Sequence, residues 1–205
     1  MVLKAKNTEE IILDAAREVF LQKGFAAARM CDIAKTANIN QAMLHYYFRK
    51  KDKLFEIIFE QESQKFYSSF ITILNSDLSF FEKLRRIVET DIQKNIAAPF
   101  LPLFILNEMH TNPVRMEQFL GSMQRHETLY MAFHQLVEQE QAAGRIWPVC
   151  PRQLFLSILG LTMFPFLAKP LIKHILDLQN QSFDQLIQDR VDYAGDMLIR
   201  SLQPS

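Results

Sequence analysis

The sequence predicts an all-α protein, and three observations support this fold class. Only 5 of the 205 residues are glycine, so the chain lacks the glycine-rich turns that connect many short strands. Apolar residues recur at spacings of three and four, as one face of a helix requires. No segment alternates convincingly between apolar and polar residues, as a half-buried strand does. Apolar residues make up 49% of the chain and charged residues 22%, which excludes an intrinsically disordered protein.

The first helix is predicted to begin after Asn7, because Asn7 and Glu10 have the spacing of a capping box. Gly24 is expected to end it with a positive φ. Two short helices follow at 29–37 and 41–47, joined by a turn at 38–40 in which asparagine tolerates the left-handed conformation. A long helix is predicted from Lys51 to about Asn75.

The remainder of the chain is also predicted to be helical, for about nine helices in all. Ser79 and Glu82 form a second capping box, and Gly144 and a Ser182 cap bound later helices. We expect the helix that starts at 151 to be kinked or broken near its two internal prolines, at 165 and 170. The predicted helices are 79–95, 98–110, 113–143, 151–170 and 183–202.

Length and charge restrict the possible functions. A chain of 205 residues allows one large domain or two small ones. The 23 basic and 23 acidic residues cancel, so no net charge attracts the whole chain to nucleic acid. Residues 29–53 differ, because six basic against two acidic residues give this segment a charge of +4. That excess indicates a local basic patch.

Cysteine usage and hydropathy predict a cytoplasmic protein. Cys31 and Cys150 lie far apart and indicate reduced thiols rather than a disulfide framework. Residues 1–10 contain no apolar stretch, so we expect no signal peptide. The longest mostly apolar run, 154–168, is shorter than the ~20 residues of a membrane span and predicts a buried helix. We therefore expect no membrane partner.

Two short helices joined by a three-residue turn and braced by a preceding amphipathic helix are typical of a helix-turn-helix. The second short helix would then contact DNA bases. Its apolar neighbours are expected to pack internally, while its other face and the basic run 49–51 face the DNA. The expected internal contacts are Ile33, Ala34, Ile39, Leu44 and Phe48.

Four segments, 24–25, 32–40, 44–48 and 51–55, together resemble the N-terminal domain of the tetracycline-repressor (TetR) family of bacterial transcription regulators over roughly residues 7–66. The resemblance implies a helix-turn-helix DNA-binding domain at 1–66 and a helical ligand-binding and dimerisation domain at 67–205. It implies a homodimer formed through the last two helices, and Leu198→Glu on the final helix is expected to disrupt it. It also implies a repressor that a small molecule releases from a near-palindromic double-stranded DNA operator.

The resemblance also implies which residues contact DNA. Asn40 matches the cap of the recognition helix, and Lys51 matches a lysine that usually contacts phosphate. Ala28 departs from the family, which usually has a threonine that caps the second helix and binds phosphate there; Arg29 is expected to substitute. The predicted DNA-binding residues are Arg29, Asn40, Gln41, Met43, His45, Tyr46, Lys50 and Lys51.

The apolar residues of the C-terminal part have two interpretations. They form either a pocket for an apolar or aromatic effector, since methionine-rich linings adapt to varied ligands, or an ordinary core. The candidate pocket residues are Phe104, Met109, Met123, Tyr130, Phe133, Met163 and Phe166.

No pattern in the sequence indicates catalysis, a cofactor or a metal. The histidines at 110, 126, 134 and 174 could suggest a metal, but His126 and His134 are two helical turns apart with no acidic residue that completes a site. No nucleophile or phosphate-binding motif occurs either. Two alternatives to a regulator stay open. One is a helical interaction protein without a DNA role, which would bind no operator. The other is a ligand-binding bundle with enzymatic activity, which would turn its ligand over.

Overall fold

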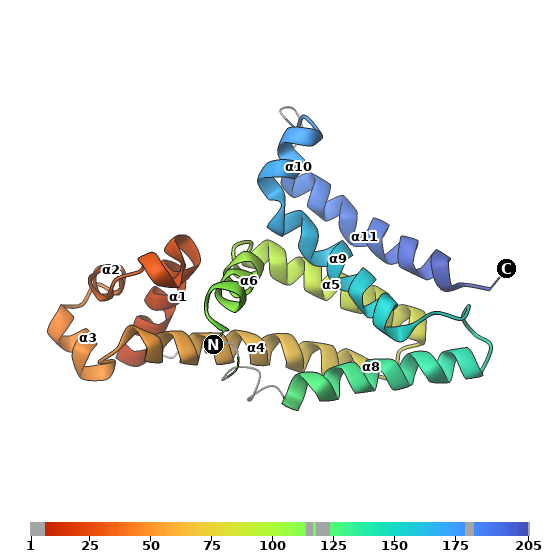
Figure 1. The fold of residues 1–205 in the computed structure, drawn as a ribbon, viewed down its shortest axis with the longest axis horizontal. Coiled ribbons are helices and arrows are strands. Elements are labelled where there is room, and N and C mark those ends of the chain that lie inside the picture. The colour runs from red at the N-terminus through yellow and green to blue at the C-terminus, as the bar shows by residue number, and fades with distance from the viewer. Residues whose placement is uncertain (1–6, 114–116, 118–123, 179–182, 205) are drawn as a thin grey trace, which may run out of the picture. The chain divides into compact units, whose positions relative to one another are not determined.

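The computed structural model of the chain describes residues 7–113, 117, 124–178 and 183–204. All regular structure in these residues is helical, which confirms the predicted all-α class (Figure 1). The helices are α1 (Thr8–Ala27), α2 (Met30–Thr36), α3 (Gln41–Tyr47), α4 (Lys51–Leu74), α5 (Phe80–Ala97), α6 (Leu101–Thr111), α8 (Gln124–Ala142), α9 (Pro151–Leu167), α10 (Lys169–Ile175) and α11 (Phe183–Leu202).

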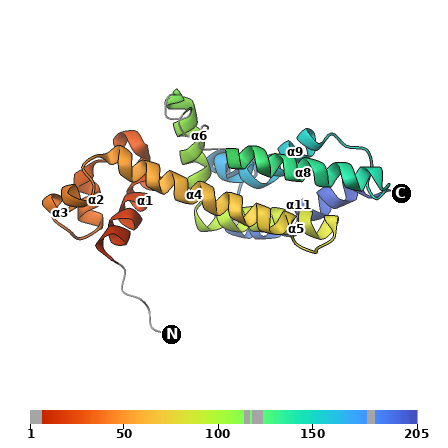
Figure 2. The same ribbon diagram turned by 90° about the horizontal axis from the view of Figure 1, so that it is seen from below.

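The chain forms two compact units, Met1–Phe66 and Tyr67–Ser205, and α4 contributes residues to both. In the first unit α1, α2 and α3 gather around the first part of α4 (Figure 2). The Asn7–Glu10 capping box at the start of α1 is confirmed, with backbone-to-side-chain distances of 3.0 and 2.8 Å. Gly24 has the expected positive φ of 73°, yet one more helical turn follows the kink and extends α1 to Ala27.

The core of the first unit is built from the apolar positions that the periodicity predicted. Ile33, Ala34, Leu44 and Phe48 are buried, as expected, and Ile39 is half-buried. A cluster of aromatic rings joins α1 to α4, because Phe25 and Phe20 both pack edge-on against Phe55. The two short helices are therefore held by packing, which seven-residue helices need in water.

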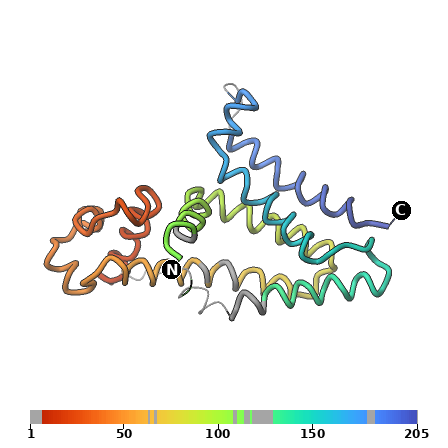
Figure 3. Tube along the Cα trace, in the orientation of Figure 1, coloured from red at the N-terminus to blue at the C-terminus, as the bar shows by residue number. Residues whose placement is uncertain are grey.

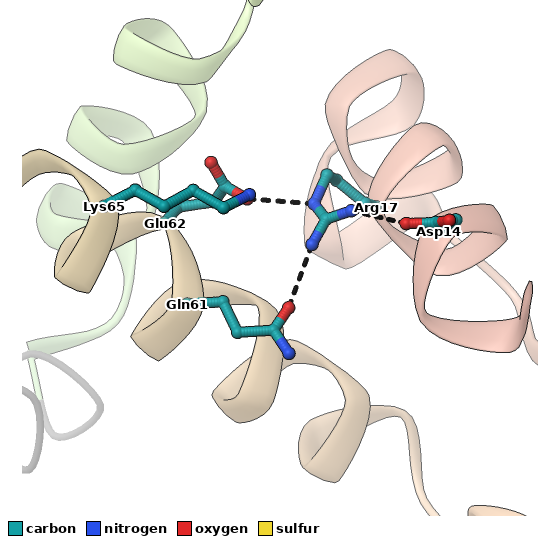
Figure 4. Close-up of polar contacts among 5 residues, drawn as sticks. All are labelled: Asp14, Arg17, Gln61, Glu62 and Lys65. Carbon is teal, nitrogen blue, oxygen red and sulfur yellow. Dashed lines mark hydrogen bonds and ion pairs between the residues drawn. The ribbon is translucent and has the colours of Figure 1, made fainter. Parts of the chain in front are cut away.

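A polar clamp joins the same two helices at Arg17 (Figure 4). Arg17 Nε lies 3.0 Å from Glu62 Oε1, and one Arg17 amino group donates to Gln61 Oε1 at 2.9 Å. The other amino group donates to Asp14 at 2.7 Å. Lys65 also lies against Glu62, at 2.9 Å, so this carboxylate receives two cations.

In the second unit α11 packs along α5, α9 packs against both, and α8 lies beside α9 (Figures 1 and 2). α5 begins with the predicted Ser79–Glu82 capping box. α8 ends at Ala142, ahead of Gly144 with φ 68°, as the sequence predicted. Pro113, the first residue of the predicted 113–143 helix, is helical, whereas residues 114–116, residues 118–123 and the Ser182 cap lie outside the described residues.

Of the two breaks predicted near the prolines of this segment, the structure has one, just before Pro170. Pro165 neither breaks nor ends the helix, which continues to Leu167. The chain bends by 80° at Ala168, and Pro170 lies in the first turn of α10, where its missing N–H costs no hydrogen bond (Figure 3). The bend thus precedes Pro170 and adds α10 as a separate short helix.

No single helix in the described ranges is both long and apolar enough to cross a membrane. The bent pair α9 and α10 meets the length and composition requirement only when its two helices are joined.

Candidate nucleic-acid interface

The turn between α2 and α3 sets the position of the recognition helix. Asn38 has a φ of 54°, the left-handed conformation that asparagine accepts more readily than most residues. The amide of Ile39 donates to the carbonyl of Ala34 at 3.0 Å, which closes the turn. The side chain of Asn40 then accepts a hydrogen bond from the Met43 amide at 2.7 Å, so Asn40 is the N-cap of α3.

The two faces of α3 differ sharply. Leu44 is fully buried, whereas Tyr46 is 84% exposed and is the most exposed large apolar side chain in the described residues. Gln41, Met43 and His45 are also exposed, as the sequence predicted for the DNA-facing side. The sequence did not decide whether Tyr47 is buried. It is exposed, and its ring meets that of Tyr46 edge-on.

The start of α2 is capped without the threonine that the family usually has. Ala28 is buried and offers no hydroxyl. Instead the carboxylate of Asp32 accepts from the Arg29 amide at 3.3 Å and pairs with Lys23 at 3.0 Å. The hydrogen bond from Lys23 holds the pKa of Asp32 below its usual value. The guanidinium of Arg29 is exposed and only donates hydrogen bonds, so it takes no part in this cap, and its phosphate contact stays a prediction.

Lys51 has a contact that the sequence did not predict. Its ammonium donates to the carbonyl oxygens of Phe25 at 2.6 Å and Ala28 at 2.9 Å, and it lies 4.2 Å from the centre of the Phe25 ring. The last turn of α1 has no basic residue of its own. Lys51 therefore satisfies carbonyl groups at the end of that helix, and its predicted phosphate contact stays a prediction.

The remaining cations form an exposed basic rim, which we define as Arg29, Lys35, Arg49 and Lys50. Within the part of the chain that the structure describes, Arg49 and Lys50 form no ion pair, whereas Lys53 pairs with Glu56 at 3.3 Å. The rim and the exposed side chains of α3 all belong to the first unit. Cations beside a helix that presents polar and aromatic side chains can bind phosphates while the helix contacts base edges.

The candidate pocket residues all belong to the second unit. Phe104, Phe133 and Phe166 are buried, and Met163 is half-buried. Tyr130 packs edge-on against Phe155, and within the described residues its buried hydroxyl has no hydrogen-bond partner. The Met109 side chain and Met123 lie outside the described part of the structure. A pocket through these residues therefore stays a prediction.

Sequence reasoning did not find the groove that the structure does describe, which is lined by α9, α10 and α11 and contains Arg190. The bend beside it, at Ala168, lies two residues before Pro170, where a break was predicted, but the packing of α11 along the bend follows no local sequence pattern. The described residues contain no group of three or more His, Cys, Asp or Glu side chains that could hold a metal ion.

Comparison with known proteins agrees with this geometry. Residues 12–58 match the family model described as "Bacterial regulatory proteins, tetR family". The probable HTH-type transcriptional regulator YttP of Bacillus subtilis is 25% identical over 176 residues, which cover 84% of each chain. The HTH-type transcriptional repressor NicS of Pseudomonas putida is 40% identical over 57 residues, 28% of this chain and 27% of NicS.

Solved structures are similar over almost the whole chain. The ketosteroid transcriptional regulator KstR2 of Mycobacterium tuberculosis has a TM-score of 0.74 at 13% identity and covers 98% of both chains. AibR, solved with isovaleryl coenzyme A and operator DNA, has a TM-score of 0.70 at 19% identity, over 93% of this chain and 97% of AibR. At these identities the structures establish the fold of the second unit as well as the first.

Proposed function

The chain belongs to the TetR family of bacterial regulatory proteins and is a DNA-binding transcription regulator rather than an enzyme; we propose that it is a homodimeric repressor that a small molecule releases from its operator. The observation that carries the proposal is the exposed face of α3, with Tyr46 and His45 beside the basic rim. A seven-residue helix held at its N-cap by Asn40 fits a major groove, which admits an α-helix.

Dimerisation is supported by an exposed apolar face on α9 and α11. Leu156 and Met197 are 59% and 41% exposed, although both lie on helices whose other faces are buried in the second unit. Gly160, one turn after Leu156, is exposed and would let another helix approach closely. A second copy of the chain on this face would remove the apolar surface from water.

Release by a small molecule requires that the molecule bind one conformation of the dimer better than the other. The second unit offers aromatic surface and an unsatisfied polar atom for such a ligand. Tyr130 and Phe133 both pack against Phe155, and the Tyr130 hydroxyl is buried without a partner among the described residues. An apolar or aromatic effector with one hydrogen-bonding group would fit these contacts.

The test is binding to the DNA that flanks the protein's own gene, measured by fluorescence anisotropy across a salt series. We expect dimer-stoichiometric binding that exceeds binding to random DNA by ~10³ or more and falls steeply with salt. Tyr46→Ala should weaken it, and Lys50→Ala should weaken it while lowering the salt slope by about one. Phe100→Ala, which removes an exposed aromatic ring of the second unit outside α9 and α11, is the control.

Three results would change the proposal. No preference for that DNA, with residual salt-dependent binding that Lys50→Ala weakens, would indicate a distant operator. Complete absence of salt-dependent binding would favour the interaction protein without a DNA role. Activation of transcription from a bound operator in a reporter assay would replace repression with activation.

A further inference from the structure

An open groove of about 630 Å³ lies where α9 bends into α10 and α11 passes the bend. This volume is typical of small-molecule sites, which span ~300–1,000 Å³. The walls are almost entirely apolar and include Phe164 on α9, Leu171 and Ile175 on α10, and Leu186 on α11. Leu171 and Ile175 are 54% and 67% exposed, so the described residues leave this surface uncovered.

One half-buried cation, Arg190, belongs to this apolar wall. Its Nε donates to the carbonyl oxygen of Leu161 at 2.8 Å. That carbonyl would normally accept from the amide four residues later, but position 165 is a proline and has no N–H. Arg190 thus replaces the hydrogen bond that Pro165 cannot make, and this bond fixes the guanidinium in the groove.

Among the described residues, the two amino groups of Arg190 have no hydrogen-bond partner and no carboxylate is paired with them. Burial accordingly lowers the pKa of Arg190. The neighbouring carboxylate, Asp189, also lines the groove but accepts instead from Gln185 at 2.8 Å, one turn earlier on the same helix. The two amino groups of this fixed guanidinium are therefore available to donate hydrogen bonds to an anion.

We propose that the groove between α9, α10 and α11 binds an aliphatic carboxylate, with its carboxylate on Arg190 and its chain along Leu171, Ile175 and Leu186. A carboxylate matches the fork of a guanidinium in charge and in geometry. The apolar walls supply the affinity for the chain. Every residue of this site belongs to the second unit, so ligand binding to it can be measured without operator DNA.

A second copy of the chain is the competing occupant. The exposed pair Leu156 and Met197, on which dimerisation was argued, does not line the groove. A helix face from a partner would also bury the guanidinium, which costs free energy unless that face brings an acid. The charge of Arg190 therefore favours a ligand that carries its own anion.

The experiment is calorimetric titration of the full chain with decanoate, decan-1-ol and decylamine, which share one chain length and differ in headgroup charge. Decanoate should bind at one site per chain and about tenfold or more tighter than decan-1-ol, and decylamine should bind weakest. Equal binding of the acid and the alcohol, or no decanoate binding, would overturn the proposal. If decanoate binds only to the monomer, as identified by sedimentation, then a second copy of the chain fills the groove in the dimer, and the proposal is wrong.

Variants locate the site. Arg190→Met keeps the apolar stem and should weaken decanoate binding about tenfold while leaving decan-1-ol unchanged. Arg190 also donates to the Leu161 carbonyl of α9, so Arg190→Met is tested again in a double variant with Pro165→Ala. The amide of the new alanine can donate to the Leu161 carbonyl in place of Arg190. Arg200→Met, an exposed arginine on the same helix, is the control. Unchanged decanoate binding in the folded double variant would refute the role of Arg190.

Discussion

The ammonium nitrogen of Lys51 lies 2.9 Å from the carbonyl oxygen of Ala28, so the first residue of α4 caps the end of α1. The structure repeats this arrangement in the second unit. There Lys83, buried near the start of α5, donates to the carbonyl oxygen of Leu74 at the end of α4 at 2.8 Å. In both cases a lysine near the start of a later helix satisfies a helix end that has no basic residue in its own last turn.

Lys51→Met should therefore destabilise the protein in the absence of DNA. Losing the charged hydrogen bonds to Phe25 and Ala28 should cost about 1–3 kcal/mol of unfolding free energy. Lys50→Met, one residue earlier and exposed, should leave the free energy unchanged within about 0.5 kcal/mol yet weaken DNA binding. Urea unfolding of both variants measures the difference, and equal stability would contradict the capping role.

The sequence predicted the helices and the buried face of the DNA-binding unit, because those depend on local spacing. Leu44 and Phe48 are inside and Tyr46 is outside, as the periodicity requires. For Lys51 the sequence predicted a phosphate contact instead. The local sequence is the same whether the ammonium of a lysine at a helix start points to solvent or toward a neighbouring helix. Which of these happens depends on where α1 ends in space, and no local pattern encodes that distance.

The same limit applies to α9. A proline inside a helix usually breaks it, yet Pro165 is buried and the helix continues. The missing bond is replaced by Arg190, which lies 25 residues later in the sequence and on another helix. A hydrogen bond between residues so far apart in the sequence can be predicted only when the packing of α9 against α11 is known. The same holds for the groove beside it.

The clamp at Arg17 should couple α1 to α4 energetically. Arg17→Met removes the ion pair with Glu62 and the hydrogen bond to Gln61, and we expect a loss of about 1–3 kcal/mol in unfolding free energy. A double-mutant cycle with Glu62→Gln should give a coupling energy of at least about 0.5 kcal/mol. Arg86→Met is the control, since the Arg86–Glu89 pair is exposed and lies within one helix. A coupling energy near zero would show that the clamp does not stabilise the unit.

Asp91 should make the stability of the second unit depend on pH. Its carboxyl is 3% exposed, and within the described residues one of its oxygens has no hydrogen-bond partner. Burial raises the pKa of Asp91, while a hydrogen bond with Thr162 and the charge of Lys94 oppose the shift. Because the folded pKa exceeds the unfolded one, the folded state holds its proton longer. Stability should therefore fall as pH rises from about 4 through the raised pKa, and then stay lower.

Asp91→Asn tests this sign, because it keeps the shape and removes the charge. The variant should be more stable than the parent chain at pH 7 and equally stable at pH 4, as measured by thermal unfolding across that range. Asp196→Asn supplies the opposite case. Asp196 is exposed, and its hydrogen bond with Arg85 lowers its pKa, so this change should not stabilise the protein at pH 7. A parent chain that becomes more stable between pH 4 and pH 7 because of Asp91 would disprove the argument.

Two neighbouring residues on α11 separate dimerisation from folding. From the sequence, Leu198→Glu was expected to disrupt the dimer. Leu198 is 4% exposed and packs within its own unit, so this change should instead unfold the subunit. Met197 is 41% exposed on the other side of the helix. If α9 and α11 form the dimer interface, Met197→Glu should give a folded monomer by sedimentation velocity, with the helical circular dichroism of the parent. That monomer should also lose operator affinity, because a single recognition helix contacts only one half-site. A Met197→Glu variant that remains a tight dimer would move the interface to another face.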